Sequence, residues 1–281
     1  MRDLKGKTAF VTGGASGFGL EFARAFLAQG MRVAIADIEE AALAPALREL
    51  GAGEDRLRGV VCDVADRDSL RAAADKAIAA FGRVHLVCNN AGVGGRAGAV
   101  EELTEQQWDW VLSVNVMGVV HGIAAFLPHM RAHGEGGHFL NTASMAGMVG
   151  QPWNGPYSAS KFAVVGISES LFYELRSSNI GVSVLCPGFA RTGIARSERN
   201  QPAALANDAE APLSAAGAAF AKQIRAAVAG GIEPVEVAAR ALRGILDDDL
   251  YIFTHPEMRP MLRKRLARIE AAYDKAEAFP G

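Results

Sequence analysis

The chain has 281 residues, of which 50% are hydrophobic, and its formal net charge is −2. A chain of this length can bury a sizeable core, and no repeat or Pro/Ser-rich linker divides it, so residues 1–281 are expected to form a single domain. The near-zero charge gives no indication of a nucleic acid or an anionic membrane as partner.

Residues 1–7 run directly into a predicted strand and do not resemble a signal peptide. We find no apolar run that approaches the length of a bilayer span. Cys62, Cys88 and Cys186 lie in separate strand-like runs, as expected for buried free thiols in a reducing cytoplasm. No Cys/His spacing is typical of a metal site. The sequence therefore predicts a cytoplasmic protein without a bound metal.

The first predicted elements are an apolar strand at 8–12, a glycine-rich loop at 13–19 and a helix at 20–29. This arrangement lays a pyrophosphate on a helix N-terminus, because glycines let the backbone approach and free N–H groups meet the charge. The spacing Gly13-x-x-x-Gly17-x-Gly19 differs from the commonest G-x-G-x-x-G fingerprint. We expect a dinucleotide at this loop.

The second predicted strand, at 32–36, ends at Asp37. A carboxylate at this point suits the ribose diol of NAD and repels the 2′-phosphate of NADP. No Arg or Lys stands at positions 15, 16 or 38 to receive such a phosphate. Asp37 could also cap the following helix, and the two roles are compatible. The expected cofactor is NAD.

Strands and helices continue to alternate, with strands at 59–64 and 84–88 around a helix at 69–81. Small and amide residues follow the fourth strand at 89–92, as expected where a parallel sheet binds a ligand. The alternation predicts an α/β fold with a doubly wound, Rossmann-like parallel sheet of about seven strands, helices on both faces and right-handed crossovers.

A long helix is predicted at 108–130, and it contains Asn115. Asparagine is a poor residue for a helix interior, so either a structural hydrogen bond or a functional role is expected. A strand at 138–140 leads to Ser144. The following helix, at 156–175, places Tyr157 and Lys161 on one face because they are four residues apart.

The Ser144, Tyr157 and Lys161 side chains suit proton transfer to and from a carbonyl. A free tyrosine has a pKa of about 10, and a lysine ammonium one turn away would lower it. Such a tyrosine could take a proton from an alcohol or give one to a ketone, while the serine hydroxyl holds the same oxygen. Taken alone, the trio does not exclude a chance pair and a turn-forming serine.

The C-terminal third begins with a strand at 181–186 that ends in Pro187-Gly188. From residue 193 to about 231 the chain is rich in alanine and lacks a regular pattern. This predicts a substrate lid at 189–231 beside the crevice, with a plain surface insertion as the alternative. A helix at 233–246 follows. A strand and a helix then form a C-terminal extension at 250–275.

The motifs occur in one order: Thr12-Gly13-x-x-x-Gly17-x-Gly19, Asn89-Asn90-Ala91-Gly92, Asn115, Ser144, Tyr157-x-x-x-Lys161 and Pro187-Gly188 followed by Thr192. Together they resemble the compact, single-domain branch of the short-chain dehydrogenase/reductase family over roughly residues 5–192. The segment 250–259 more loosely resembles bacterial members that oxidise benzylic alcohols of lignin-derived aryl ethers.

The resemblance implies a role for each motif residue. Tyr157 is the general acid/base, Lys161 holds the nicotinamide ribose and lowers the tyrosine pKa, Ser144 polarises the substrate oxygen and Asn115 supports a water relay. Asp63 and Val64 border the adenine, Asn90 the adenosine side, and Thr192 and Ile194 the nicotinamide. The full expected cofactor set is Gly13, Ser16, Gly17, Phe18, Gly19, Asp37, Asp63, Val64, Asn90, Ala91, Gly92, Tyr157, Lys161, Pro187, Gly188, Thr192 and Ile194.

The expected function is hydride transfer between NAD(H) and a hydrophobic secondary alcohol or ketone, aromatic ones included. Met145, Trp153 and Phe189 would line an apolar pocket, with core packing as the alternative role of Met145 and Trp153. An epimerase or dehydratase, or a non-catalytic dinucleotide-binding protein, is the alternative on the same fold. The spacing of the glycine loop disfavours an epimerase or dehydratase. The presence of both Tyr157 and Lys161 disfavours a non-catalytic protein. The resemblance also implies a homodimer or homotetramer.

Overall fold

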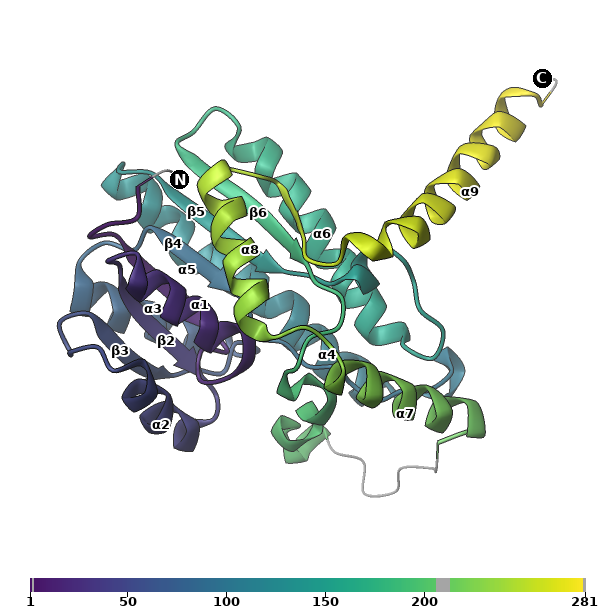
Figure 1. Ribbon diagram of the computed structural model, residues 1–281, viewed down its shortest axis with the longest axis horizontal. Coiled ribbons are helices and arrows are strands. Elements are labelled where there is room, and N and C mark those ends of the chain that lie inside the picture. Colours follow the sequence, from purple (N-terminus) through teal and green to yellow (C-terminus); the bar gives the residue numbers. More distant parts are fainter. Residues whose placement is uncertain (2, 206–212, 280–281) are drawn as a thin grey trace.

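The computed structural model describes residues 1, 3–205 and 213–279, and its centre is a parallel sheet (Figure 1). Within these residues the sheet has seven strands in the order β3-β2-β1-β4-β5-β6-β7, and every neighbouring pair is parallel. The strands are β1 Thr8–Thr12, β2 Arg32–Asp37, β3 Leu57–Val61, β4 Leu86–Asn89, β5 Gly137–Thr142, β6 Ile180–Cys186 and β7 Tyr251–Phe253. The predicted doubly wound α/β fold is confirmed.

Helices cover both faces of this sheet. The helices of the described residues are α1 Gly17–Ala28, α2 Glu40–Leu50, α3 Arg67–Phe81, α4 Glu105–Leu112, α5 Gly118–His133, α6 Gly155–Leu175, α7 Ala215–Ala229, α8 Pro234–Asp247 and α9 Arg259–Glu277. One face carries α1, α2 and α8, and the other carries α3, α5 and α6. The winding reverses between β1 and β4, and in such sheets ligands bind at the carboxyl ends of the strands at this point.

The core forms on both faces because successive strand residues point to opposite sides. In β1, Val11 packs in the cluster beneath α1 and α8, whereas Phe10 packs in the cluster beneath α3 and α5. The Phe10 ring lies 4.7 Å from that of Phe126 in α5. Both rings are fully buried, and burial of such a side chain stabilises a fold by about 1.5–3 kcal/mol. This double core fixes the strand ends from which the site is built.

The predicted helix at 108–130 is part of a longer helical run, Glu105–His133, that is interrupted at Asn115. Residues Ser113–Met117 form a π turn between α4 and α5. By length and composition alone this run could span a membrane, contrary to the sequence prediction. However, Phe126 and Met130 in α5 are fully buried against the sheet, as in the core helix of a globular fold.

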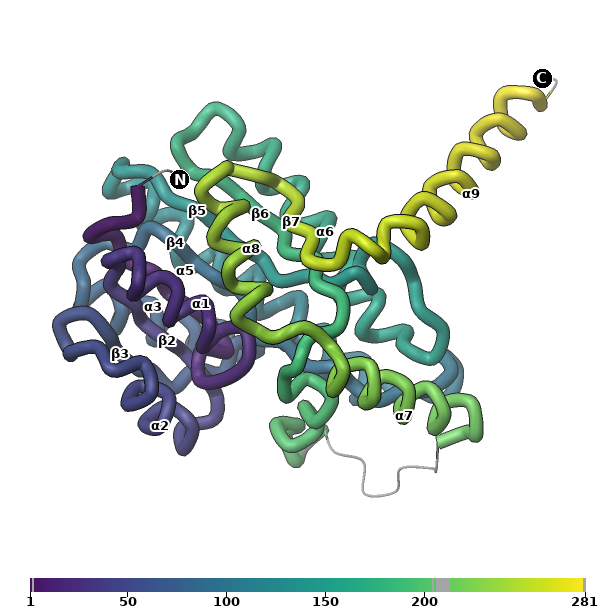
Figure 2. Tube along the Cα trace, viewed as in Figure 1, coloured from purple at the N-terminus to yellow at the C-terminus, as the bar shows by residue number. Residues whose placement is uncertain are grey.

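The C-terminal third differs most from the prediction. Residues 215–229 form the regular helix α7, which Ser214 caps by accepting a hydrogen bond from the Gly217 N–H at 3.3 Å. Residues 206–212 of the expected lid lie outside the described part of the chain. The extension at 250–275 is present as β7 and α9, but α9 projects away from the body (Figure 2).

Candidate active site

A cavity of about 520 Å³ opens at the carboxyl ends of β1, β2, β4, β5 and β6. Its described lining includes most of the predicted residues: Gly13, Ser16, Gly17, Phe18, Asp37, Asp63, Val64, Asn90, Ala91, Gly92, Ser144, Met145, Tyr157, Lys161, Pro187, Gly188, Phe189, Thr192 and Ile194. Gly19, Asn115 and Trp153 are not part of this described lining. The structure therefore gathers the glycine loop and the Ser-Tyr-Lys trio around one space.

The glycine loop at one end of the cavity is a close-fitting backbone turn. Gly17, the first residue of α1, has a φ of +53°, which favours glycine. A Cβ on Gly19 would collide with the carbonyl oxygen of Gly13, so Gly19 allows the helix to pack on the loop. The N-terminus of α1 can thus approach an anion closely.

Asp37 ends β2 beside this loop and is buried. Its two carboxylate oxygens accept N–H groups from Ala15 at 2.9 Å and Glu39 at 3.0 Å. Burial raises the pKa of Asp37, and these hydrogen bonds oppose the rise. The bonds fix the orientation of the carboxylate at the cavity wall.

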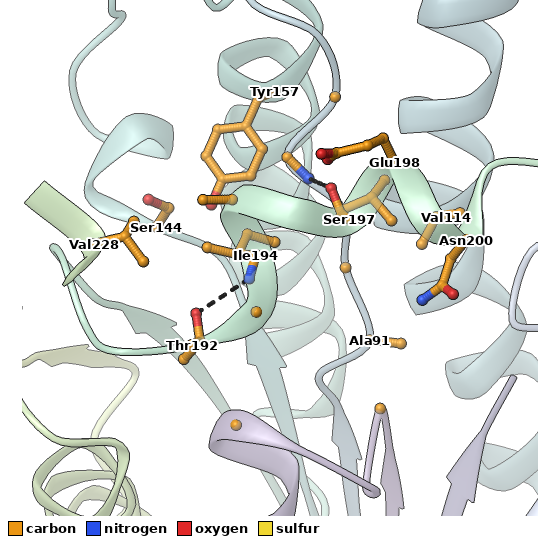
Figure 3. Close-up of a pocket in the computed structure, with 18 of the residues that line it drawn as sticks. Ala91, Val114, Ser144, Tyr157, Thr192, Ile194, Ser197, Glu198, Asn200 and Val228 are labelled. Carbon is orange, nitrogen blue, oxygen red and sulfur yellow. Dashed lines mark hydrogen bonds between the residues drawn. The ribbon is translucent and has the colours of Figure 1, made fainter. Parts of the chain in front are cut away.

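A second acidic residue near Asp37, Glu39, was not predicted to contribute to the site. Glu39 accepts hydrogen bonds from Arg199 at 2.6 Å and Asn200 at 2.8 Å, and these hydrogen bonds lower its pKa. On the other side, the Ser197 hydroxyl accepts the N–H of Gly94 at 2.9 Å (Figure 3). The segment Gly193–Asn200 is therefore tied to two walls of the cavity. Glu39 and Arg199 are 160 residues apart, so no local pattern could have indicated this contact.

The trio meets at the other end of the cavity. Ser144 follows β5 and faces the hydroxyl of Tyr157, which projects from α6 (Figure 3). The Lys161 amine lies 5.5 Å from the centre of the Tyr157 ring and donates a hydrogen bond to the Thr142 carbonyl at 2.9 Å. The predicted convergence of these side chains is present in the structure.

The electrostatics of the trio differ from the expectation. Burial raises the pKa of Tyr157, although a hydrogen bond from Ser144 opposes the rise. Burial also lowers the pKa of Lys161 to about 8. Burial thus acts on the Tyr157 pKa in the direction opposite to the expected lowering, and the Lys161 amine faces the Tyr157 ring.

Asn115 lies just outside the cavity and is buried. Its amide donates to the Val93 carbonyl at 2.9 Å and to the Ser160 hydroxyl at 3.0 Å, and its oxygen accepts the Val93 N–H at 2.8 Å. These bonds join the loop after β4 to α6. The structural reason for an asparagine inside the helical run is thus present.

The apolar part of the cavity only partly matches the prediction. Met145 and Phe189 line it, but the predicted Trp153 does not belong to its described lining and is 38% exposed. Trp153 has a φ of +59°, and this turn conformation accompanies the outward placement of its side chain. The remaining apolar lining includes Phe220, Ile224 and Val228 of α7, a helix that the sequence pattern did not reveal.

His255 supports the loop that follows β6, although no histidine had an expected role. The Nδ1 atom of His255 accepts the Gly188 N–H at 3.0 Å, and its Nε2 atom donates to the Phe189 carbonyl at 3.0 Å. A Cβ on Gly188 would come within 2.7 Å of the His255 ring, so the contact is close. From the other side, the Met145 N–H donates to Pro187 at 2.8 Å.

Comparison with known proteins agrees with this geometry. Residues 7–203 match a family model described as short chain dehydrogenase. The chain is 34% identical to a C alpha-dehydrogenase from Sphingobium sp. strain SYK-6, over 100% of this chain and 90% of that protein. It is also 34% identical to a CLA biosynthesis dehydrogenase/reductase from Lactiplantibacillus plantarum, over 96% of this chain and 95% of that protein.

Among solved structures, a short chain dehydrogenase/reductase from Burkholderia phymatum in complex with NAD superposes with a TM-score of 0.92. The two sequences are 41% identical, and the match covers 97% of each chain. The family model and the two relatives each cover well over half of the chain. We conclude that the chain belongs to the short chain dehydrogenase family.

Proposed function

We propose that the protein is an NAD-dependent dehydrogenase that oxidises hydrophobic secondary alcohols, aromatic ones included, and reduces the corresponding ketones. The observation that carries this proposal is that Ser144, Tyr157 and Lys161 line the same cavity as the glycine loop and Asp37. A proton-transfer group and a dinucleotide cradle at the two ends of one space fit hydride transfer coupled to proton transfer.

The chain's own residues suit the cofactor. The glycine loop and the N-terminus of α1 would hold the pyrophosphate, Asp37 the adenosine ribose, and Asp63 with Val64 the adenine side. The remaining expected contacts come from Asn90, Ala91, Gly92, Pro187, Gly188, Thr192 and Ile194, all of which line the cavity. Bound NAD would supply the acceptor for the hydride.

Ser144, Tyr157 and Lys161 have separate roles in the proton transfer. During oxidation Tyr157 takes the proton of the substrate hydroxyl, and during reduction it returns a proton to the carbonyl oxygen. Ser144 donates a hydrogen bond to this oxygen as charge develops on it. Lys161 would hold the nicotinamide ribose. In this proposal Asn115 supports the water relay through its main chain, because its side-chain donors are already used and a π turn loosens the backbone ladder.

The substrate would enter beside the apolar side chains of Met145, Phe189 and α7. We place the lid at 189–231, and the ties from Glu39 to Arg199 and from Ser197 to Gly94 support a segment that closes over the cofactor. Assembly as a homodimer or homotetramer in the cytoplasm belongs to the same proposal. Exposed Met117 and Tyr173, on the helical run and α6, support pairing through these helices.

The test is a screen for NADH formation with aliphatic, cyclic and benzylic secondary alcohols at alkaline pH. We expect NADH to accumulate, fastest with the bulky apolar alcohols. An epimerase would return the hydride to its substrate and release no NADH. Intact NAD binding without turnover of any alcohol or ketone would instead support a non-catalytic dinucleotide-binding protein.

A further inference from the structure

The helix α9 leaves the body of the protein and extends into solvent (Figures 1 and 2). All of its 19 residues are described, and none of them is buried. It is about 28 Å long by the rise of an α-helix. Its first turns touch α6 where the Arg265 guanidinium lies 5.1 Å from the centre of the Phe162 ring. Most helical stability comes from packing of an apolar face, so this helix is expected to have a partner.

Five apolar side chains of α9 form one narrow seam, and Met261 lies outside it. Leu262, Leu266, Ile269, Tyr273 and Ala276 follow one another at spacings of 4, 3, 4 and 3 residues. This is the spacing of the a and d positions of a coiled coil, with Leu266 and Tyr273 at a. Leu266 is 47% exposed and Tyr273 is 66% exposed. A seam of this kind fits a second helix of the same type.

The charges of α9 are sorted along its length. The first half carries Arg259, Arg263, Lys264, Arg265 and Arg268 and no acidic residue, whereas Glu270, Asp274 and Glu277 all lie in the second half, together with the single basic residue Lys275. An antiparallel pair of these helices would set the basic half of each beside the acidic half of the other. A parallel pair would set like charges together.

We propose that α9 pairs antiparallel with α9 of a second copy of this chain about a two-fold axis. An antiparallel coiled coil opposes a and d positions, so Leu266 lies against Ile269 of the second copy, and Leu262 against Tyr273 of the second copy. The same register sets Arg263 beside Glu270 of the second copy. The interface is self-complementary, as a two-fold axis requires.

A membrane surface is a weaker match for this helix. The helix α9 has some character of an interfacial helix, because it carries six basic side chains, three acidic ones and an apolar seam. The acidic residues are all in the distal half, however, so an anionic bilayer would repel the end of the helix. The sorted charges favour a copy of the same helix.

Disulfide trapping tests the pairing and its direction. Two forms of the full chain, one with Leu266→Cys and one with Ile269→Cys, carry different tags and are coexpressed. The native Cys62, Cys88 and Cys186 are all buried, so the background is low. We expect a disulfide mainly between the two different forms. Crosslinks mainly between two Leu266→Cys chains would show parallel pairing, and no crosslink would show no pairing; either result would overturn the proposal.

Charge exchange tests the register in the same trapping assay. Arg263→Glu should reduce the rate of crosslinking by about tenfold, because each of the two symmetric ion pairs becomes a repulsion. Adding Glu270→Arg to the same chain should restore it. The matched control is Lys264→Glu, which makes the same charge change at an outward position and should have little effect. A double variant as slow as Arg263→Glu would contradict the register.

Vesicle flotation tests the membrane directly, and it uses the full chain with phosphatidylcholine vesicles that contain phosphatidylserine. We expect the protein to remain off the vesicles. Binding that requires α9, together with no crosslinking in solution, would assign the helix to a membrane and overturn the proposal. Neither result bears on the alcohol dehydrogenase activity, which is measured separately by NADH formation.

Discussion

Ionisable side chains gather at both ends of the sheet, and the two groups differ in how their polar atoms are used. At the carboxyl end, Ser144, Tyr157 and Asp37 present polar atoms to an open cavity. At the amino end, His85, His133 and Glu135 form a tight group, with ligand atoms within 4.8 Å of one another. Residue types alone would mark both groups as candidate sites.

The amino-end group is saturated by the protein's own hydrogen bonds. The Nδ1 atom of His85 accepts the Thr8 N–H at 3.2 Å, so its Nε2 carries the proton and donates to Glu135 at 2.8 Å. Glu135 also pairs with Lys7 and Arg83. Protons and basic side chains thus occupy the directions that a metal would need. The comparison teaches that available polar atoms beside a cavity, rather than residue types, distinguish a reactive site from a structural network.

The largest expected effect at the carboxyl end follows removal of the Tyr157 hydroxyl. Tyr157→Phe should lower kcat for alcohol oxidation by about 10²–10⁴-fold, since the proton then has no positioned acceptor. The affinity for NADH, measured by fluorescence titration, should change little. A change of His85→Asn at the amino end should do the opposite, lowering the melting temperature and leaving kcat unchanged. A Tyr157→Phe variant that keeps most of its turnover would reject the mechanism.

The next effect concerns cofactor choice. Asp37→Ala should raise KM for NAD by about 10–100-fold, the value of hydrogen bonds to a charged group, and should raise KM for NADP much less. Glu40→Ala is the matched control, because it removes a nearby carboxylate that is exposed and is not part of the described cavity lining. If the parent protein already prefers NADP, the assignment of Asp37 to the ribose is wrong.

His255 should show a smaller effect of the same kind. His255→Ala removes both hydrogen bonds that hold the loop at Gly188 and Phe189, so we expect kcat/KM to fall by about tenfold. The measurement is steady-state kinetics on the folded protein. His129, whose Nε2 atom accepts the Val84 N–H at 3.2 Å, lies at the amino end, and His129→Ala serves as a control that should reduce only the melting temperature. If kcat/KM is the same in the His255→Ala variant and in the parent, the position of this loop does not affect catalysis.

The smallest effect is a pH-dependent loss of stability at the amino end. Hydrogen bonds from His85 and Lys7 lower the pKa of Glu135 to about 2 from an ordinary value of 4.5. A lowered folded-state pKa contributes stability above the unfolded value, and this is lost as the pH falls from 4.5 toward 2. Glu135→Gln should therefore lower the melting temperature at neutral pH but not near pH 2. A similar difference at both pH values would contradict the assigned network.

The sequence contained the parts of the site that depend on local spacing. The glycine loop, Asp37, Ser144 and the pair Tyr157 and Lys161 each follow a strand or lie one helical turn apart, so a parallel sheet brings them together. The family assignment, confirmed by comparison, rests on these same motifs.

The remaining features depend on contacts between distant residues or on burial. The tie from Glu39 to Arg199 and the support of Gly188 by His255 join segments that are far apart in the chain. The raised pKa of Tyr157 reflects lost water, which spacing does not reveal. Trp153 was expected in the apolar pocket, but it is 38% exposed and lies outside the described lining. The helix α7 was missed because an alanine-rich segment carries a weak apolar stripe.

The central claim is that Tyr157 exchanges the proton of the substrate. Its most direct test is the rate of a single turnover of alcohol oxidation as a function of pH, at saturating NAD, in the parent and in Tyr157→Phe. Because burial raises the pKa of Tyr157, the parent rate should climb from neutral into alkaline pH as the phenol ionises, and the variant should be slow at every pH. A flat parent profile, or a variant that climbs with the same slope, would contradict the account.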